Sequence, residues 1–277
     1  APAAASRPET AMQVLRTSTD PDAFFSSLRR AARRVLFLDY DGTLAPFRVE
    51  RGEAVPYEGL RPRLRTLIGS GRSRVVVVSG RWTRDVLPLL GLPQTPEIWG
   101  CHGWERLRPP DPAEIGFIGE EAVRGLVEAD EWAQKEGLQR RCERKPASVA
   151  VHWRGLPPDE VGVLKDKVLS RWKRISAKAG LSTHAFDGGL ELRAPGRDKG
   201  TAVRTVLSEE PAGSPAAYLG DDRTDEDAFL ALEGRGLRVL VREELRPTEA
   251  DLWLRPPGEL LAFLDRWIDA TKGEPAE

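Results

Sequence analysis

Cysteine is scarce in this chain of 277 residues. The two cysteines, Cys101 and Cys142, lie far apart with no second pair near them, so their spacing indicates neither a zinc site nor a disulfide framework. No apolar run is long enough to cross a bilayer, and residues 1–20 lack the basic start and apolar stretch of a secretory signal. We therefore expect a cytoplasmic protein with reduced thiols that does not act in a membrane.

The chain also has no excess of either charge, because 42 Lys and Arg residues nearly balance 43 Asp and Glu residues. This balance gives no electrostatic indication of binding to nucleic acid or to an anionic membrane. No internal repeat is evident. We expect a small-molecule ligand that a local site recognises, and the composition is consistent with a monomer.

Unbroken apolar runs at residues 35–38 and 75–78 predict strands that are buried on both faces, as in a parallel sheet. Helical spacing at residues 60–68 lies between them, and Asp20 before Pro21 predicts the start of an earlier helix. The late part of the chain alternates in the same way, with helices expected at residues 199–207, 225–232 and 259–268 and strands at 216–219 and 237–241. The pattern predicts an α/β fold with a doubly wound parallel-sheet core.

The middle of the chain has a different pattern. Two long amphipathic helices, near residues 120–138 and 159–179, separate strands in which polar and apolar residues alternate, which predicts a sheet with one wet face. Arg141, Glu143 and Lys145 share one parity, as do His152 and Arg154. We expect residues 105–192 to form an inserted α+β cap domain over a core domain of residues 20–104 and 193–277. Residues 1–19, rich in Ala, Pro, Ser and Thr, are expected to be a disordered leader.

Carboxylates follow two of the predicted strands. Asp39 and Asp41 lie at and just past one strand end, and Asp221, Asp222 and Asp225 follow another. A cluster of this kind is compatible with a simple turn. However, parallel strands bring their carboxyl ends together, and the convergence of several carboxylates predicts a hard cation with oxygen ligands, for which magnesium fits best.

Two further residues are candidates for binding an anion at a helix start. Ser79 follows the strand of residues 75–78, and Lys199 begins a helix, where a lysine is slightly unfavourable unless an anion lies near it. Taken alone, Ser79 is better explained as an ordinary helix cap, and Lys199 is also compatible with a surface lysine. Cys101 beside His102 suggests a thiol nucleophile, but no third group to orient the pair is apparent.

Four of these segments, in this order, resemble the motifs of the haloacid-dehalogenase (HAD) superfamily: residues 39–44 (Asp-Tyr-Asp-Gly-Thr-Leu), residues 79–81 (Ser-Gly-Arg), Lys199, and residues 220–222 (Gly-Asp-Asp). The resemblance implies a HAD-like core and phosphoryl transfer through an aspartyl phosphate, with Asp39 as nucleophile and Asp41 as general acid and base. It implies that Asp39, the backbone carbonyl of Asp41 and Asp221 hold Mg²⁺. It further implies that Ser79 and Lys199 orient the phosphoryl oxygens, and that metal or phosphate is supported by Asp222, Asp225, Gly80 and Arg81.

Other runs resemble the trehalose-6-phosphate phosphatases in particular, namely residues 100–105, 143–145, 152–154, 190–193 and 218–229. In that family the cap closes over the core and its polar residues bind the disaccharide. The resemblance therefore implies trehalose 6-phosphate as substrate and a functional pairing with a trehalose-6-phosphate synthase. It implies these substrate-binding residues: His102, Glu143, Lys145, His152, Glu191 and Arg193. Trp104 and Trp153 depart from the family's usual residues and could reshape the sugar pocket.

Three alternatives remain at this stage. The same core could serve another glycosyl phosphate, such as glucosyl- or mannosyl-3-phosphoglycerate or sucrose 6-phosphate, and the first two would require further cap arginines for the extra carboxylate. The chain could be a catalytically silent sugar-phosphate-binding regulatory domain, although the joint presence of Asp39, Asp41, Lys199 and Asp221 argues against this. A phosphomutase would share the aspartate pair but must exclude water.

Overall fold

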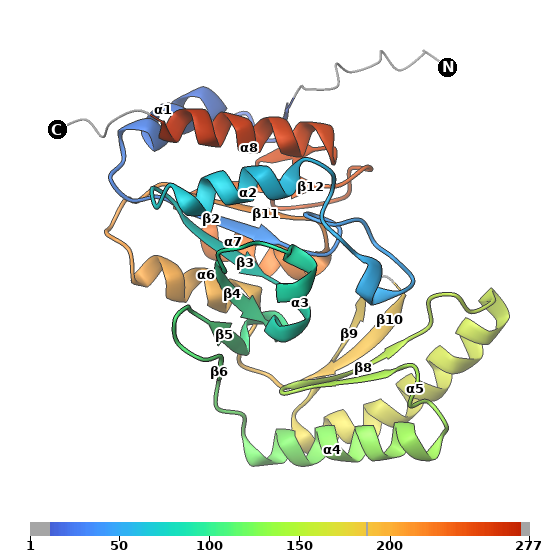
Figure 1. The fold of residues 1–277 in the computed structure, drawn as a ribbon. Helices are drawn as coiled ribbons and strands as arrows, with labels where there is room; N and C mark the ends of the chain where they lie inside the picture. The colour runs from blue at the N-terminus through green and yellow to red at the C-terminus, as the bar shows by residue number, and fades with distance from the viewer. Residues whose placement is uncertain (1–11, 187, 273–277) are drawn as a thin grey trace, which may run out of the picture.

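The main sheet has nine strands, in the order β1-β13-β12-β11-β2-β3-β4-β5-β6, in the computed structural model, which describes residues 12–186 and 188–272 (Figure 1). The strands from β13 to β4 run parallel. They are β13 (Leu252–Leu254), β12 (Leu237–Val241), β11 (Ala216–Gly220), β2 (Val35–Asp39), β3 (Arg74–Val78) and β4 (Glu97–Gly100). Antiparallel strands flank them, with β1 (Gln13–Val14) at one edge and β5 (Glu105–Leu107) and β6 (Glu114–Ile115) at the other.

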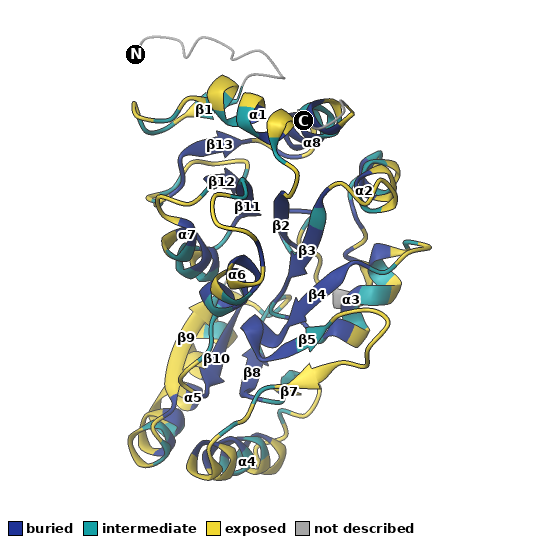
Figure 2. Ribbon diagram, turned by 90° about the vertical axis from the view of Figure 1, so that its left-hand side faces the viewer, coloured by how far each residue is buried: buried dark blue, intermediate teal, exposed yellow. Residues whose placement is uncertain are grey.

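Helices cover both faces of this sheet, because the central strands are apolar on both sides. Leu36 and Leu38 pack in one apolar cluster, and Val35 and Phe37 pack in the other. The first cluster is covered by α1 (Pro21–Arg30), α2 (Leu60–Gly69), α3 (Thr83–Leu90) and α8 (Gly258–Thr271), and the second by α6 (Lys199–Ser208) and α7 (Glu226–Leu232). Figure 2 shows α6 and α7 on one side of the strands and α2 and α3 on the other. The predicted doubly wound core is confirmed.

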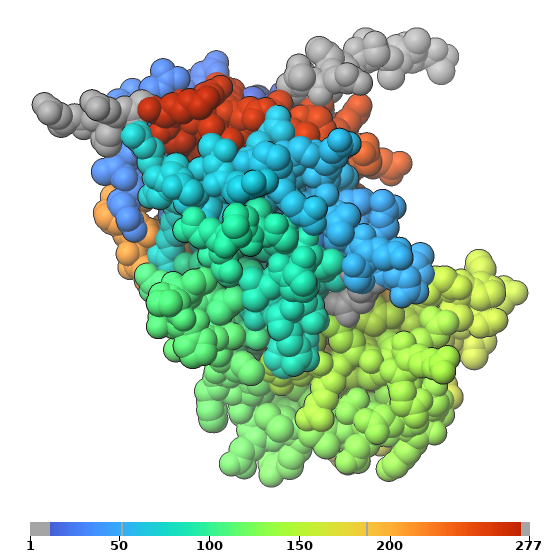
Figure 3. Space-filling view, in the orientation of Figure 1, coloured from blue at the N-terminus to red at the C-terminus, as the bar shows by residue number. Residues whose placement is uncertain are grey.

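A second sheet of four antiparallel strands forms the cap, in the order β7-β8-β10-β9. The strands are β7 (Cys142–Lys145), β8 (Ser148–His152), β10 (Gly189–Arg193) and β9 (Ser182–Phe186), and the helices α4 (Glu120–Lys135) and α5 (Pro158–Ala179) cover one face. Trp172 of α5 packs there with Val149 and Leu192, and the other face is turned toward the core. Figures 1 and 3 show the cap below the core, and the predicted inserted α+β unit is present.

Three predicted boundaries differ from the structure. The smallest difference is at the end of the cap, because Arg193 is the last residue of β10 although the core was predicted to resume at residue 193. The strands β5 and β6 extend the main sheet, because a short 3₁₀ turn, Cys101–Gly103, folds β5 back onto β4. Residues 105–115 therefore lie with the core, although the cap was predicted to begin at residue 105. Gln13 and Val14 pair with β13, so the predicted disordered leader does not extend to residue 19. Residues 1–11 lie outside the described part of the chain.

Local signals explain several element ends. The carboxylate of Asp20 accepts a hydrogen bond from the backbone N–H of Ala23 at 2.9 Å, as predicted for a helix cap followed by Pro21. Single 3₁₀ turns occur at Arg51–Glu53 and Arg223–Asp225. Within the described residues, no helix is both long enough and apolar enough to span a membrane.

Candidate active site

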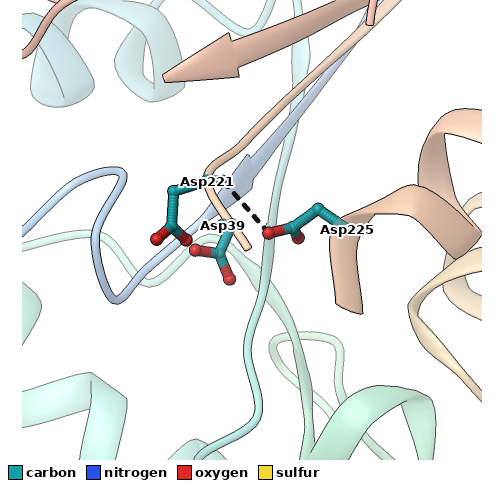
Figure 4. A group of neighbouring side chains, drawn as sticks. All are labelled: Asp39, Asp221 and Asp225. Carbon is teal, nitrogen blue, oxygen red and sulfur yellow. Dashed lines mark hydrogen bonds between the residues drawn. The ribbon is translucent and has the colours of Figure 1, made fainter. Parts of the chain in front are cut away.

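Buried carboxylates meet at the carboxyl ends of two neighbouring parallel strands (Figure 4). Asp39 is the last residue of β2, and Asp221 follows the last residue of β11. Together with Asp225 they offer carboxylate oxygens that all lie within 4.8 Å of one another. The structure therefore brings together the two acidic segments that the strand pattern predicted would converge.

Asp225 uses both of its oxygens within the protein. Its Oδ1 accepts hydrogen bonds from Lys199 Nζ at 2.7 Å and from the hydroxyl of Tyr218 at 2.7 Å. Its Oδ2 accepts from the backbone N–H groups of Asp221 at 3.0 Å and of the next residue at 2.9 Å. Asp225 therefore orients Lys199 and the loop that carries Asp221, and it has less capacity than its neighbours to bind a ligand directly.

Asp39 and Asp221 retain oxygens for a ligand. Lys199 Nζ donates to Asp39 Oδ1 at 2.6 Å, whereas Asp39 Oδ2 and Asp221 Oδ1 are buried without a hydrogen-bond partner among the described residues. Burial and the nearby charge of Asp225 raise the pKa of Asp39 to about 7, and burial and the charge of Asp39 raise the pKa of Asp221 well above its ordinary value. Lys199 thus does not compensate the whole acidic cluster, and the oxygens fit a small divalent cation.

A glycine leaves room for this arrangement. Gly42 has a φ of 85°, which favours glycine, and a Cβ at this position would lie 2.1 Å from Asp221 Oδ2. The Asp-x-Asp-Gly pattern therefore has a geometric basis, because any larger residue at position 42 would occupy the space into which the carboxylate of Asp221 points.

Asp41 is held by an arginine of the next strand end. Arg81 donates from Nε to Asp41 Oδ2 at 2.6 Å and from Nη2 to Asp41 Oδ1 at 2.5 Å, and Arg81 is buried whereas Asp41 is partly exposed. Ser79 is fully buried, and its Oγ accepts a hydrogen bond from the backbone N–H of Arg81 at 3.1 Å. The predicted contact of Ser79 with a phosphoryl group stays a prediction.

One cavity connects these residues with the cap. Its described lining residues are Asp39, Asp41, Phe47, Arg48, Gly80, Arg81, His102, Lys145, His152, Arg154, Phe186, Glu191, Arg193, Lys199, Asp221, Asp222 and Thr224. Three predicted site residues are not among these lining residues, namely Ser79, Glu143 and Asp225, although Glu143 contacts Nε2 of the lining residue His152 at 3.0 Å. Most of the predicted site residues from both parts of the chain therefore surround one space.

The cap residues reach the cavity because the strand register aligns them on one face. Glu143 lies opposite Ala150, which lies opposite Glu191, and Lys145, Ser148 and Arg193 form the neighbouring row. The intervening residues, such as Val149 and Leu192, pack on the helices. The parity of Glu143 and Lys145 therefore identified a polar face correctly, but this face is largely buried against the core and is not wet as predicted.

Glu191 is more strongly paired than the sequence indicated. Its Oε1 accepts from Lys145 Nζ at 2.8 Å and Ser148 Oγ at 2.6 Å, and its Oε2 accepts two hydrogen bonds from Arg193, at 2.8 and 2.6 Å. Although burial opposes ionisation, Lys145 and Arg193 hold the pKa of Glu191 well below its ordinary value. Glu191 therefore fixes the two cationic side chains in the cavity wall.

His102 lies where the core meets this network. His102 Nε2 lies 2.9 Å from Nη2 of Arg193, which is a donor, and 3.2 Å from Oε2 of Glu191, which is an acceptor. Burial and the charge of Arg193 lower the pKa of His102 to about 3, so the ring is neutral. A Cβ on Gly80 would lie 2.6 Å from this ring, so the glycine of the Ser-Gly-Arg motif makes room for the histidine.

Two aromatic residues of the cavity wall were not predicted from the sequence. Phe186 meets His152 edge-on, with ring centroids 5.3 Å apart, above Gly189, which lies opposite both in the sheet. Phe47 lies under the guanidinium of Arg154 at 5.0 Å. Phe47 lies only a few residues beyond the Asp-x-Asp motif, and this closeness in sequence could have indicated that it belongs to the site. Only the strand register identifies Phe186 as a residue of the cavity wall. Arg48 and Thr224 also line the cavity and were not predicted from the sequence.

The two unusual tryptophans lie outside the cavity. Trp104 is buried and Trp153 is partly buried, both in the apolar cluster of the cap, and neither is among the described lining residues. They therefore contribute to packing of the cap. Burial raises the pKa of the Cys101 thiol well above its ordinary range, so this side chain is a poor nucleophile.

The core and the inserted α+β cap together have a HAD-like fold. The trehalose-6-phosphate phosphatase C-terminal domain of Candida albicans has the same fold, with a TM-score of 0.75 over 92% of this chain and 99% of that one at 21% identity.

A family model described as trehalose-phosphatase matches residues 37–252, and the chain belongs to this family. A probable trehalose-phosphate phosphatase of rice is 31% identical over 88% of this chain and 73% of its own length. An uncharacterized glycosyl hydrolase of Mycobacterium tuberculosis is 33% identical over 90% of this chain, which spans 20% of the mycobacterial protein.

Proposed function

We propose that this protein is a magnesium-dependent phosphatase that hydrolyses trehalose 6-phosphate to trehalose and phosphate. The observation that carries the proposal is the single cavity in which Asp39, Asp41 and Lys199 face a polar cap sheet. The core residues account for phosphoryl transfer, and the cap residues account for recognition of a neutral sugar. The family to which the chain belongs supports the choice of substrate.

In the first half-reaction, Asp39 attacks phosphorus while the bond from phosphorus to the sugar oxygen breaks. Lys199 holds Asp39 Oδ1 at 2.6 Å, so that the carboxylate has a fixed orientation. Asp41 donates a proton to the leaving sugar oxygen. For this step, Asp41 must exchange part of its pairing with Arg81, and the incoming phosphoryl oxygens are alternative partners for the guanidinium.

In the second half-reaction, Asp41 removes a proton from water, and the water oxygen attacks phosphorus as the bond to Asp39 breaks. The same residue thus serves as acid and then as base. Lys199 and Arg81 neutralise the charge on the phosphoryl oxygens, which is where catalysis of phosphoryl transfer is concentrated.

Magnesium would be held by Asp39, Asp221 and the backbone carbonyl of Asp41. The fit rests on the buried oxygens of Asp39 and Asp221 that lack a partner among the described residues and on the space that Gly42 leaves. When bound, the ion supplies charge that offsets repulsion between the anionic substrate and the acidic residues.

The disaccharide would lie against the polar face of the cap. Lys145 and Arg193 are fixed by Glu191 and can donate to sugar hydroxyls, and the rings of Phe47 and Phe186 offer apolar surface to a sugar. A Lys145→Ala variant should raise KM for trehalose 6-phosphate far more than for a small aryl phosphate, and so should Glu143→Ala, because Glu143 contacts His152 of the cavity wall. Equal effects on the two substrates would exclude a role in sugar recognition.

Phosphate release from a panel of sugar phosphates, with Mg²⁺ present and then chelated, tests the whole proposal. Trehalose 6-phosphate should be preferred over glucose 6-phosphate, sucrose 6-phosphate and glucosyl-3-phosphoglycerate, and chelation should abolish turnover. Asp39→Asn should abolish turnover and phosphoenzyme formation while substrate still binds. Preference for another sugar phosphate would be compatible with the mechanism but would exclude trehalose 6-phosphate as the substrate. If no phosphate were released from any member of the panel, a catalytically silent binding domain would be favoured.

We further propose that the protein acts in the cytoplasm as a monomer and is paired functionally with a trehalose-6-phosphate synthase. Both cysteines are free, which suits a reducing compartment. Analytical ultracentrifugation of the purified chain measures its mass in solution and so tests whether it is a monomer.

A further inference from the structure

Arg246, in the loop after β12, contacts the loop that carries Asp221. Its Nε donates to the backbone carbonyl of Asp221 at 3.2 Å, and its Nη2 donates to the backbone carbonyl of Asp222 at 2.7 Å. The side chain is largely buried, with 15% of its surface exposed. A residue distant in sequence therefore binds the two peptide carbonyls next to the acidic cluster.

Arg246 is itself fixed by the start of α7. Its Nη1 pairs with the carboxylate of Glu226. Glu226 also accepts hydrogen bonds from the hydroxyl of Thr248 at 2.8 Å and from the backbone N–H of Glu249 at 2.8 Å. The guanidinium is thus held by the two carbonyls of the acidic loop on one side and by Glu226 of α7 on the other. Glu226 also binds residues 248 and 249, so the segment that carries Arg246 is attached to the same helix.

Arg246 and Asp225 act on opposite ends of the same backbone segment. Asp225 accepts the N–H groups of Asp221 and Asp222, and Arg246 donates to their carbonyls. Hydrogen bonds therefore fix both the N–H groups and the carbonyl groups of these two loop residues. The carboxylate of Asp221 remains directed toward Asp39 and Gly42, with its Oδ1 unpaired among the described residues.

We propose that Arg246 is a positioning residue for the metal site, which orients the carboxylate of Asp221 through these two carbonyls. This inference rests on the proposed function, because it assumes that Asp221 binds a divalent cation. Arginine suits the task because its planar fork binds two carbonyls and a carboxylate at once, whereas a lysine ammonium cannot reproduce that fixed geometry. Partners that orient metal ligands typically change metal affinity by about 10- to 100-fold when they are removed.

The test measures metal binding directly, by calorimetry with Mg²⁺ and by the electron paramagnetic resonance of Mn²⁺, in the full chain without substrate. Arg246→Met and Arg246→Lys should each raise the Kd for the metal by about 10-fold or more. At saturating Mg²⁺ the KM for trehalose 6-phosphate should stay near that of the wild type. Arg255→Met is the matched control, because Arg255 lies over the ring of Trp253 outside the cavity and contacts neither carbonyl, and its metal Kd should be unchanged.

The outcomes separate this inference from the proposed function. Wild-type protein that binds neither ion would overturn the metal site and the role of Arg246 with it. Wild-type protein that binds metal, with Arg246→Met and Arg246→Lys unchanged in Kd, would overturn the role of Arg246 alone. Metal affinity that is lost in Arg246→Met but fully kept in Arg246→Lys would assign the effect to charge and overturn the positioning role. Arg246→Lys retains a positive charge at this position, so its metal Kd still tests the proposal if Arg246→Met does not fold.

Discussion

Gly42 shows how one residue without a side chain controls the acidic site. Its positive φ and the 2.1 Å approach of Asp221 Oδ2 to a Cβ position both exclude alanine. We expect Gly42→Ala to lose metal binding and to reduce kcat/KM for trehalose 6-phosphate by at least about 100-fold, because Asp221 is one of the proposed metal ligands. The measurements are calorimetric titration with Mg²⁺ and steady-state kinetics.

The control for Gly42→Ala is Gly180→Ala. Gly180 has a comparable φ of 62°, but a Cβ there has nothing within 4 Å. This variant should lose about 1 kcal/mol of stability through backbone strain and keep full activity. If both variants had equal activity, the space around Asp221 would have no catalytic role.

Gly189 has a corresponding role in the cap. A Cβ at this position would lie 2.0 Å from the ring of Phe186, which rests over the glycine beside His152. Gly189→Ala should displace Phe186, raise KM for trehalose 6-phosphate several-fold and leave the kinetics of an aryl phosphate unchanged. An unchanged KM for the disaccharide would show that Phe186 does not contact the sugar.

At the scale of elements, burial pattern and length decide what the sequence can predict. Strands β2 and β3 were identified because their residues are apolar and buried on both faces. The short edge strands β1 and β6 have two residues each, too few for any periodic signal, and the cap boundary was therefore placed too early. The convergence of the acidic residues was predictable because strand ends converge, whereas the contacts of Phe186 and Arg246 are pairings that only the folded chain provides.

A cluster of ion pairs joins the sheet to the end of α6. Arg74 on β3 donates to Glu97 on β4 at 2.7 Å and to Glu209 after α6 at 2.6 Å, and Arg106 on β5 donates to Glu209 at 2.8 Å. Arg106 and Arg74 lower the pKa of Glu209 from 4.5 to about 2, although burial opposes them. The ionised Glu209 therefore contributes its full stabilisation at pH values above 4.5, the pKa of this group in the unfolded chain. The contribution is lost as the pH falls toward 2, the pKa in the folded chain.

The pH dependence gives a test of this cluster. Wild type should have a higher Tm than Glu209→Gln at pH 6, and the difference should shrink steadily as the pH is lowered from 5 to 3. Differential scanning calorimetry across this range measures it. A difference in Tm that is independent of pH would show that the ionised form of Glu209 contributes no stability.

At the scale of the whole molecule, the cavity depends on how the cap meets the core. Trp82 Nε1 donates to the carbonyl of Arg144 in the cap at 3.2 Å, and Arg193 reaches His102 at 2.9 Å. The guanidinium of Arg154 in the cap also lies over the ring of Phe47 in the core at 5.0 Å. Because Phe47 and Arg154 both line the cavity, their contact joins the two parts in the cavity wall.

A double-mutant cycle with Phe47→Ala and Arg154→Ala tests that contact. A cation over an aromatic ring contributes about 0.5–1 kcal/mol at partly exposed sites, so the two changes should be non-additive in kcat/KM for trehalose 6-phosphate by about two- to five-fold. The control is Arg255→Ala, which removes a similar contact with Trp253 at 4.9 Å, outside the cavity, and should leave kcat/KM unchanged. Strict additivity would mean that Phe47 and Arg154 act on the substrate separately and do not hold the cap against the core.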